Sequence, residues 1–286
     1  MPRALFYPLG YPVEIVSGDE AALEAASDLW RSWPALFDAA PVKIQIEVHG
    51  GAAPCRAPRF SAPAGSLRFS SDEMNFAEFD PGARCGKLSI AADALGSGIF
   101  RHHFLEALGL SALDAVFFTP LHAACVSRDN AGILLCGDSG SGKSSLAYAC
   151  ARGGWTLVSD DAVHLAPGPD RIGVGGSNVI RLREPGALPT SEQTIEIDAA
   201  AQGLRVARSA PADQCIFLKR RPGPAAWREF PAREATRYFL KYIEPRETSR
   251  AARHLGEFLD SPPLLLEYED VEDAVGAIEA SVGAAA

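Results

Sequence analysis

The hydrophobic pattern is most regular over residues 42–48, where Val-Lys-Ile-Gln-Ile-Glu-Val alternates apolar and polar side chains. Strict alternation predicts a strand with one buried face. Residues 21–30 carry apolar side chains at helical spacing, and residues 67–70 and 88–92 are further short strand candidates. This mixture of one helix and several strands predicts a small α+β domain over residues 1–112.

A second helical pattern lies near the end of this region, over residues 99–108, and we expect Gly109 to end that helix. The apolar run 115–118, closed by a Thr-Pro pair, is then a short strand candidate. We place the domain boundary between these segments, after residue 112, so that residues 113–286 form the second predicted domain.

Strands and a helix then follow one another closely along the chain. Residues 121–127 and 133–136 are strand candidates, and the turn sequence Arg-Asp-Asn-Ala-Gly at 128–132 separates them. Residues 144–152 predict a helix that two glycines end, and residues 155–158 predict the next strand. This order indicates an α/β fold.

The remaining chain is less regular. Residues 167–212 are rich in Gly, Pro and Ala and predict no clear element. Residues 215–220 predict a late core strand, whereas residues 263–268 and 273–282 predict a strand and an amphipathic closing helix. We interpret this C-terminal pair as structural.

Bulk composition narrows the classes of function. Hydrophobic residues make up 47% and charged residues 22%, and the formal net charge is −9. An acidic chain without a run of Lys or Arg is a poor candidate for binding nucleic acid, because that affinity comes from clustered cations. The six cysteines have no Cys-x-x-Cys spacing, which argues against a zinc site. Apolar runs are too short for a membrane span or a signal-peptide core, so we expect a cytoplasmic protein with no membrane partner.

The strongest chemical signal is the loop Gly-Asp-Ser-Gly-Ser-Gly-Lys-Ser between a predicted strand and a predicted helix. Glycines let the backbone turn successive N–H groups toward one anion, and the helix N-terminus adds partial positive charge. Lys143 supplies a point charge for the β- and γ-phosphates, and the Ser144 hydroxyl is placed to ligate Mg²⁺. The predicted nucleotide-binding residues are Gly137, Asp138, Ser139, Gly140, Ser141, Gly142, Lys143, Ser144 and Ser145.

Two adjacent carboxylates, Asp160 and Asp161, directly follow the strand predicted at 155–158. A phosphate site with bound metal needs a carboxylate for Mg²⁺, and a kinase also uses one near the acceptor hydroxyl. Alone, an Asp pair is more typical of a solvated turn. Its position one helix and one strand after a phosphate loop favours the functional interpretation.

The register of the predicted hairpin places one histidine. A turn centred between Asp129 and Asn130 pairs His122 with Gly137, the first residue of the loop. His122 would then stand at the phosphate end of the sheet, where it could contact the phosphates or orient Asp160. A hydrogen-bonded structural histidine is the alternative interpretation.

These three features together resemble the catalytic domain of HPr kinase/phosphorylase. The matching segments are Leu-His-Ala-Ala-Cys-Val at 121–126, the loop 137–144 and Leu-Val-Ser-Asp-Asp at 157–161. The spacings between them agree with that family, whereas the metal Asp of Ras-like and RecA-like proteins follows a later strand. The resemblance implies a divergent member with a P-loop kinase core of the HPr kinase/PEP carboxykinase-like type and a mixed sheet.

The resemblance also implies ATP and Mg²⁺ as cofactors and assigns roles to the residues that match. Lys143 holds the transferred phosphate, Ser144 with Asp161 binds Mg²⁺, and Asp160 is the base that takes the acceptor's proton. His122 is the remaining expected catalytic residue. At the level of sequence the roles of Asp160 and Asp161 are interchangeable.

One segment departs from the family. The signature Arg-Gly-Leu-Gly-Ile is replaced by Val-Ile-Arg-Leu-Arg-Glu-Pro at 179–185, which argues against HPr as the acceptor and against reverse phosphorolysis. Arg181 or Arg183 could reach a phosphate, or both could be solvated on a surface strand. For the basic run 219–221 we favour a charge cluster on an edge strand over a phosphate contact.

Two functions from different classes remain. The first is an ATP-dependent kinase for a hydroxyl-bearing acceptor, either a serine of a peptide or protein or a metabolite alcohol, with the N-terminal domain as the docking surface. The second is a nucleotide-binding regulatory switch without an acceptor, which needs one metal carboxylate instead of two. A carboxykinase-like enzyme is disfavoured because its extra metal ligands are not identifiable. A homo-oligomer is among the compatible states.

Overall fold

The computed structural model describes residues 1–50, 56–183, 194–243 and 248–283, and the chain divides into two compact units, Met1–Phe117 and Phe118–Ala286. Both units combine helices with sheets that contain parallel and antiparallel strand pairs, so the expected mixed α/β class is confirmed. Within the described residues, no helix has the length and apolar character needed to cross a bilayer.

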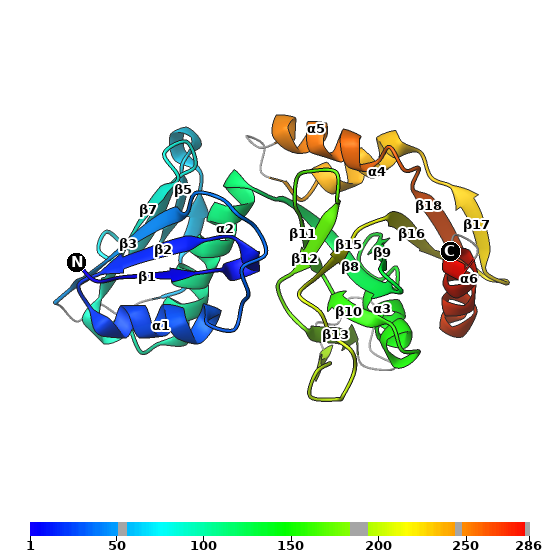
Figure 1. The fold of residues 1–286 in the computed structure, drawn as a ribbon, viewed down its shortest axis with the longest axis horizontal. Coiled ribbons are helices and arrows are strands. Elements are labelled where there is room, and N and C mark those ends of the chain that lie inside the picture. Colours follow the sequence, from blue (N-terminus) through cyan, green and yellow to red (C-terminus); the bar gives the residue numbers. More distant parts are fainter. Residues whose placement is uncertain (51–55, 184–193, 244–247, 284–286) are drawn as a thin grey trace. The chain divides into compact units, whose positions relative to one another are not determined.

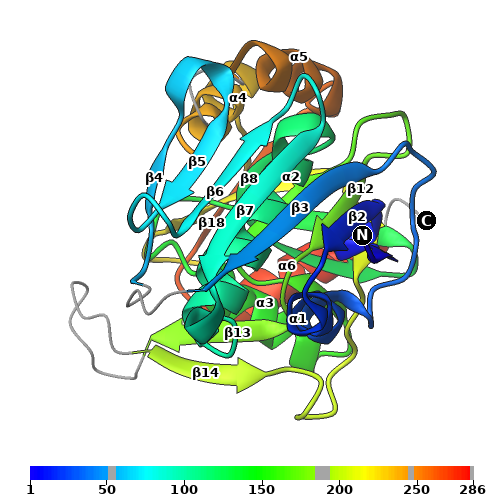
Figure 2. The ribbon, with the colours of Figure 1, turned by 90° about the vertical axis from the view of Figure 1, so that its left-hand side faces the viewer.

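The first unit is built on a sheet of seven strands in the order β1-β2-β3-β7-β6-β5-β4, which Figure 2 shows from β4 to β2. The alternating segment at 42–48 forms its central strand β3, with Val42, Ile44 and Ile46 buried. The strands are β1 (Arg3–Phe6), β2 (Val13–Ser17), β3 (Val42–His49), β4 (Arg59–Ser61), β5 (Leu67–Ser70), β6 (Phe76–Asp80) and β7 (Cys85–Ala91).

The helices of the first unit are α1 (Glu20–Trp30) and α2 (Ala107–Val116), and α2 continues from a π-helical stretch, Ile99–Glu106. Asp19 begins α1 by accepting a hydrogen bond from the Ala21 N–H at 2.9 Å. Single 3-10 turns occupy Pro8–Gly10, Pro63–Gly65 and Ala92–Ala94.

Two expectations at the end of this unit are wrong. Gly109 does not end a helix but lies inside α2, where a Cβ would come within 2.8 Å of the Trp30 ring, so this glycine permits close packing. The apolar run 115–118 is not a strand, because α2 extends to Val116 and the next strand begins at Thr119. A run of four apolar residues is too short for its periodicity to distinguish a strand from the end of a helix. The boundary expected after residue 112 falls within α2.

The second unit is a sheet with helices on both faces (Figure 1). Its order is β15-β12-β11-β8-β9-β16-β18-β17, with β10 also paired to β8. The strands are β8 (Thr119–Arg128), β9 (Ala131–Cys136), β10 (Thr156–Ser159), β11 (Ala162–Leu165), β12 (Ile172–Gly175), β15 (Ser209–Pro211), β16 (Gln214–Arg220), β17 (Ala226–Glu229) and β18 (Leu264–Tyr268).

Alternate residues of the long strand β8 supply two separate cores. Ala123 and Cys125 pack on the side of helices α4 (Ala232–Leu240) and α5 (Thr248–Phe258). Ala124 and Val126 pack on the side of α3 (Lys143–Arg152) and α6 (Val271–Gly283). The three-layer arrangement buries both sheet faces, which is why these strands are almost wholly apolar.

The irregular prediction for residues 167–212 is wrong in part. Besides β12 and β15, the segment forms a two-stranded hairpin of β13 (Val179–Arg183) and β14 (Thr194–Asp198). Glu184 and Pro185 lie outside the described residues. Each strand has only five residues and pairs with no strand of the large sheets, so its alternation is too short to stand out in a segment rich in Gly and Pro.

Candidate nucleotide and catalytic site

The hairpin of β8 and β9 has the register expected from its turn. Asp129 and Asn130 have φ angles of 52° and 64°, which two-residue hairpin turns require, and Ala123 pairs with Cys136. His122 therefore lies next to Gly137 at the end of β9. On its other side His122 pairs with Ala162, the first residue of β11.

The glycine-bearing loop connects β9 to α3. Gly137, Gly140 and Gly142 have φ angles of 143°, 84° and 101°, a region that glycine adopts without strain. No side chain caps the N-terminus of α3, and Asp138, Ser139 and Gly140 are exposed. Free backbone N–H groups at a helix N-terminus can bind an anion.

Lys143 is the most buried cation of this region, with a relative exposure of 7%. Its Nζ donates to the Gly137 carbonyl oxygen at 2.7 Å and lies 3.2 Å from Nε2 of His122. Burial lowers the pKa of the ammonium, although Asp161 and Asp160 oppose that shift. The side chain is thus held across the loop with its charge incompletely compensated.

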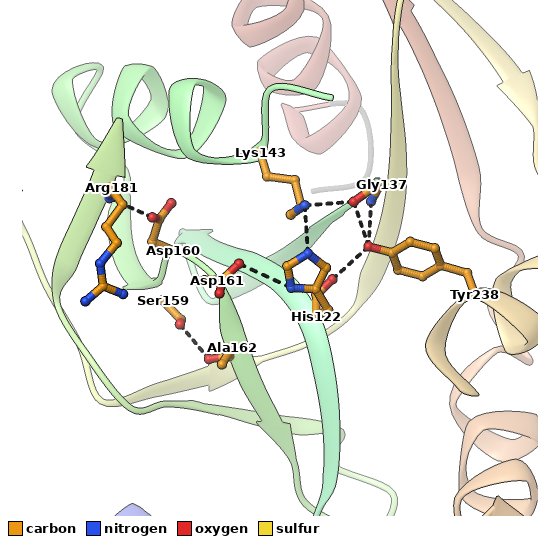
Figure 3. Close-up of polar contacts among 9 residues, drawn as sticks. All are labelled: His122, Gly137, Lys143, Ser159, Asp160, Asp161, Ala162, Arg181 and Tyr238. Carbon is orange, nitrogen blue, oxygen red and sulfur yellow. Dashed lines mark hydrogen bonds and ion pairs between the residues drawn. The ribbon is translucent and has the colours of Figure 1, made fainter. Parts of the chain in front are cut away.

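His122 connects this lysine to an acid (Figure 3). Its Nδ1 lies 3.2 Å from Oδ1 of Asp161, while its Nε2 faces the Lys143 ammonium. Because an ammonium can only donate, Nε2 accepts and the ring proton sits on Nδ1, directed at Asp161. Burial, followed by the Lys143 charge, lowers the pKa of His122, which agrees with a neutral ring.

Asp160 and Asp161 lie in the short connection from β10 to β11, which the Ser159 hydroxyl closes by donating to the Ala162 carbonyl at 2.6 Å. Their environments differ. Asp160 is 3% exposed, whereas the side chain of Asp161 is 64% exposed beside His122. The two carboxylates therefore lie in positions suited to different tasks.

The buried carboxylate is only partly satisfied. Oδ2 of Asp160 accepts from the Arg181 N–H at 2.8 Å, and Oδ1 has no hydrogen-bond partner in the described part of the chain. Burial raises the pKa of Asp160, while the Arg181 N–H and the Ser144 hydroxyl lower it. A divalent cation between this carboxylate and the Ser144 hydroxyl would satisfy the orphaned oxygen, so these residues fit the Mg²⁺ that the sequence implies.

That cation would need further oxygen ligands. Among the described residues, no group of three or more His, Cys, Asp or Glu side chains is arranged to hold a metal ion. Mg²⁺ is commonly bound by one or two protein ligands together with phosphate oxygens and water. The donor set at Asp160 and Ser144 is of that kind.

Tyr238 of α4 links the loop to the strand that carries His122. Its hydroxyl lies 2.7 Å from the Gly137 carbonyl oxygen and 3.1 Å from that of His122, and it accepts from the Gly137 N–H at 3.2 Å. Sequence reasoning missed this residue, because nothing near residue 238 signals a partner about a hundred positions earlier.

A cavity of about 480 Å³ joins most of these groups, and its walls also include the hairpin β13–β14 and the end of β16. Lys143, Ser144, His122 and Asp161 all line this cavity, and Arg181 and Arg183 line it from the hairpin. Its lining residues are His122, Ser139, Gly140, Gly142, Lys143, Ser144, Ser145, Asp161, Arg181, Arg183, Thr194 and Arg220.

Three larger cavities lie elsewhere in the described part of this unit. One of about 670 Å³ surrounds the hairpin turn at Asp129 and Asn130, at the opposite end of β8 and β9 from the loop. Another of about 790 Å³ lies between Gly137, Phe217 and α4, and a third of about 700 Å³ lies along α4. None of the three is lined by Lys143, Ser144 or either Asp, whereas the smaller cavity is lined by Lys143, Ser144 and Asp161, so it is the better candidate site.

Comparison with known proteins adds little to this picture. No family model matches the chain, and no curated protein matches it. A solved structure of the HPr(Ser) kinase/phosphatase from Coxiella burnetii is similar over 53% of this chain and 79% of that chain, with 19% sequence identity and a TM-score of 0.33. This is a distant structural similarity, from which nothing about chemistry follows.

Proposed function

We propose that this chain is an ATP-dependent, Mg²⁺-using kinase of the HPr kinase-like type that transfers the γ-phosphate to a hydroxyl group. One observation carries the proposal: a glycine loop at a helix N-terminus, a buried lysine and the exposed Asp161 carboxylate line one cavity. The neighbouring, buried carboxylate of Asp160 accepts from the N–H of Arg181, a residue that also lines this cavity. A switch needs the loop and one metal carboxylate, whereas this cavity also presents an exposed, histidine-paired acid.

The phosphate chain is proposed to lie against residues 137–145. Backbone N–H groups at the start of α3 face the anion, and Lys143 exchanges its contact with the Gly137 carbonyl for the β- and γ-phosphates. Giving up a 2.7 Å hydrogen bond is offset by pairing a partly desolvated ammonium with a dianion. Nucleotide binding should therefore rearrange the loop.

The geometry favours exchanging the roles that the resemblance gave to the two acids. Asp160 is buried beside Ser144 and carries the orphaned oxygen, so we propose that Asp160 and Ser144 hold Mg²⁺. When bound, the ion neutralises charge on the phosphates. The Arg181 N–H keeps the Asp160 carboxylate oriented.

Asp161 is then the base. Its carboxylate accepts the proton of the acceptor hydroxyl while the acceptor oxygen bonds to the γ-phosphorus and the bond from that phosphorus to the β,γ-bridging oxygen breaks. His122 orients Asp161 through Nδ1–H and limits its motion. The exposed position of Asp161 leaves room for an acceptor of any size, so a peptide or protein serine and a metabolite alcohol both remain candidates.

A nucleotide-dependent switch is the second candidate, favoured by one contact. Lys143 closes the loop on itself through the Gly137 carbonyl, and Tyr238 ties that carbonyl to α4. Loss of this contact on nucleotide binding would be transmitted to α4 without any transfer of phosphate.

The deciding experiment uses the purified full chain, ATP labelled at the γ-phosphate, Mg²⁺ and cell extract fractions. A kinase transfers label to a hydroxyl acceptor, and the transfer stops with Asp161→Asn. Saturable ATP binding with no labelled acceptor in any fraction supports the switch instead. For the first unit we propose a role in docking the acceptor; in that case, variants on its surface raise the acceptor KM without changing nucleotide affinity.

A further inference from the structure

Three consecutive cations, Lys219, Arg220 and Arg221, lie at the end of β16 and directly after it, and their side chains alternate between opposite faces. Lys219 and Arg221 point to Glu267 of β18, with nitrogen–oxygen distances of 3.6 and 2.9 Å. Arg228 of β17 joins them at 2.7 Å, and Glu267 itself is only 6% exposed. This group is a structural cluster, as the sequence favoured for the whole basic run. The expected edge position is wrong, because β16 lies inside the sheet between β9 and β18.

Arg220 differs from its two neighbours. Its guanidinium lies over the ring of Tyr268, 5.2 Å from the ring centroid, and Nη1 donates to the Glu269 carbonyl at 3.2 Å. Among the described residues, no carboxylate lies within ion-pair distance of it. The side chain lines the cavity together with Gly142 and Lys143.

The topology explains why Arg220 reaches the loop. Strands β9, β16 and β18 run parallel, and Phe217 pairs with Cys136, so β16 continues for three residues beside the loop that follows β9. The Tyr268 hydroxyl at the end of β18 donates to the Ser141 carbonyl at 2.8 Å. Carboxyl ends of parallel strands are where α/β proteins bind ligands.

The side chains of Tyr268 and Arg220 lie close to the loop at Gly142. A Cβ placed on Gly142 would lie 2.1 Å from the Tyr268 hydroxyl and 3.4 Å from Nη2 of Arg220. The guanidinium thus stands beside the N-cap of α3, where the phosphates of a nucleotide are proposed to bind. Tyr268 provides a rigid aromatic surface that fixes its direction.

We propose that Arg220 is a catalytic arginine supplied by the chain itself, which binds the β- and γ-phosphates of the nucleotide and stabilises charge on the phosphoryl group in transfer. The inference rests on the proposed kinase function. A guanidinium offers planar paired donors to phosphate oxygens and stays charged at every working pH. A contact of this kind to the β- and γ-phosphates contributes to the binding of the nucleotide as well as to the transition state of transfer.

The test compares Arg220→Ala, Arg220→Lys and the matched control Lys219→Ala by titration calorimetry with Mg·ATP and with AMP. We expect Arg220→Ala to weaken Mg·ATP binding by roughly tenfold or more while AMP binding is unchanged. Arg220→Lys should keep part of the affinity because it keeps the charge. Lys219→Ala should bind both nucleotides as the wild type does.

The outcomes separate the two proposals. If the wild-type chain binds neither nucleotide, the proposed function fails and this inference fails with it. If the wild type binds Mg·ATP and Arg220→Ala binds it equally well, only the role of Arg220 is overturned. An equal loss of Mg·ATP and AMP affinity would also overturn it, since that pattern indicates a distorted loop instead of a lost phosphate contact.

Discussion

The two units of the chain differ in the charge of their buried polar side chains and in how completely these side chains are paired. In the first unit, the buried Ser17 hydroxyl donates to the Ile46 carbonyl at 3.2 Å, and buried Asn75 accepts from the Ala91 N–H while its amide donates to Asp72. These are neutral groups with internal partners. They fix strand and turn geometry at little electrostatic cost.

The second unit buries charge and leaves it incompletely paired. Lys143 and Asp160 are both nearly inaccessible to solvent. Burial lowers the pKa of Lys143 and raises the pKa of Asp160, so it favours the neutral form of each side chain. A fold gains nothing from that arrangement, because desolvating an unpaired charge destabilises it. Such groups are instead typical of binding and catalytic sites, so the difference between the units supports the proposal of a site in the second unit.

The largest effect is expected from Lys143→Ala. Removing the ammonium from the loop should lower phosphoryl transfer by ~10³-fold, because its charge cannot be replaced by solvent at a buried position. The variant should stay folded, since it removes a desolvated charge. The rate of label transfer from ATP measures the first effect, and the thermal midpoint measures the second.

Lys43→Ala is the matched control in the first unit. Lys43 lies 3.8 Å from Glu14 on the surface, and we expect unchanged transfer and a nearly unchanged midpoint. Full activity in Lys143→Ala would refute the mechanism proposed for the loop.

Asp160 in the second unit and Asp72 in the first should have opposite effects on how stability depends on pH. Burial raises the pKa of Asp160, so the folded state holds this proton more strongly than the unfolded chain does. Stability therefore falls as the pH rises through the raised pKa of Asp160. Hydrogen bonds led by the Asn75 amide lower the pKa of Asp72, so Asp72 contributes stability above pH of about 4 that is lost on acidification.

We therefore expect Asp160→Asn to raise the thermal midpoint at pH 7 and Asp72→Asn to lower it, with both differences vanishing near pH 3. Asp160→Asn should also lower transfer by ~10²-fold or more, whereas Asp72→Asn should not. Calorimetric melting at a series of pH values tests both. A lower midpoint for Asp160→Asn at pH 7 would mean that its carboxylate is structural.

A smaller effect is expected from His122→Asn, with a loss of transfer of ~10-fold to 100-fold. Burial lowers the pKa of His122, so the wild type should lose activity only below the ordinary histidine range, when the ring protonates and can no longer accept from Lys143. The variant should lack that acidic limb. His102→Asn, at a residue paired with Glu106 on the surface of the first unit, should leave the pH profile unchanged.

The smallest effect on function belongs to Ser17→Ala in the first unit. The change leaves the Ile46 carbonyl without its side-chain donor and should cost about 1 kcal/mol of stability. Nucleotide affinity should not change, because every residue that lines the candidate cavity lies in the second unit. Denaturant unfolding and nucleotide titration of the same preparation measure both quantities.

Sequence reasoning succeeded where a local signal determines the geometry. The Asp129–Asn130 turn sets the hairpin register, which brings His122 beside Gly137. Strict alternation at 42–48 predicted β3, and the glycines after residue 136 predicted the start of α3. In each case the relevant neighbours are close in sequence or follow a strict period.

The rest depends on contacts between distant parts of the chain. Tyr238 reaches the loop from α4, and the hairpin β13–β14 brings the Arg181 N–H to Asp160. Arg220 had a weak signal, since strand alternation separates it from both of its basic neighbours, but only the parallel pairing of β16 with β9 places it at the loop. Gly109 was misjudged because its partner, the Trp30 ring, is far away in sequence.

The most direct test of the central claim is the dissociation constant of Mg·ATP, measured by titration calorimetry on the full chain and on Lys143→Ala. We expect one saturable site in the wild type and an affinity at least ~10-fold weaker in the variant, because a charge-assisted contact to phosphate is lost. Equal dissociation constants, or no saturable binding by the wild type, would contradict the assignment of this cavity to a nucleotide.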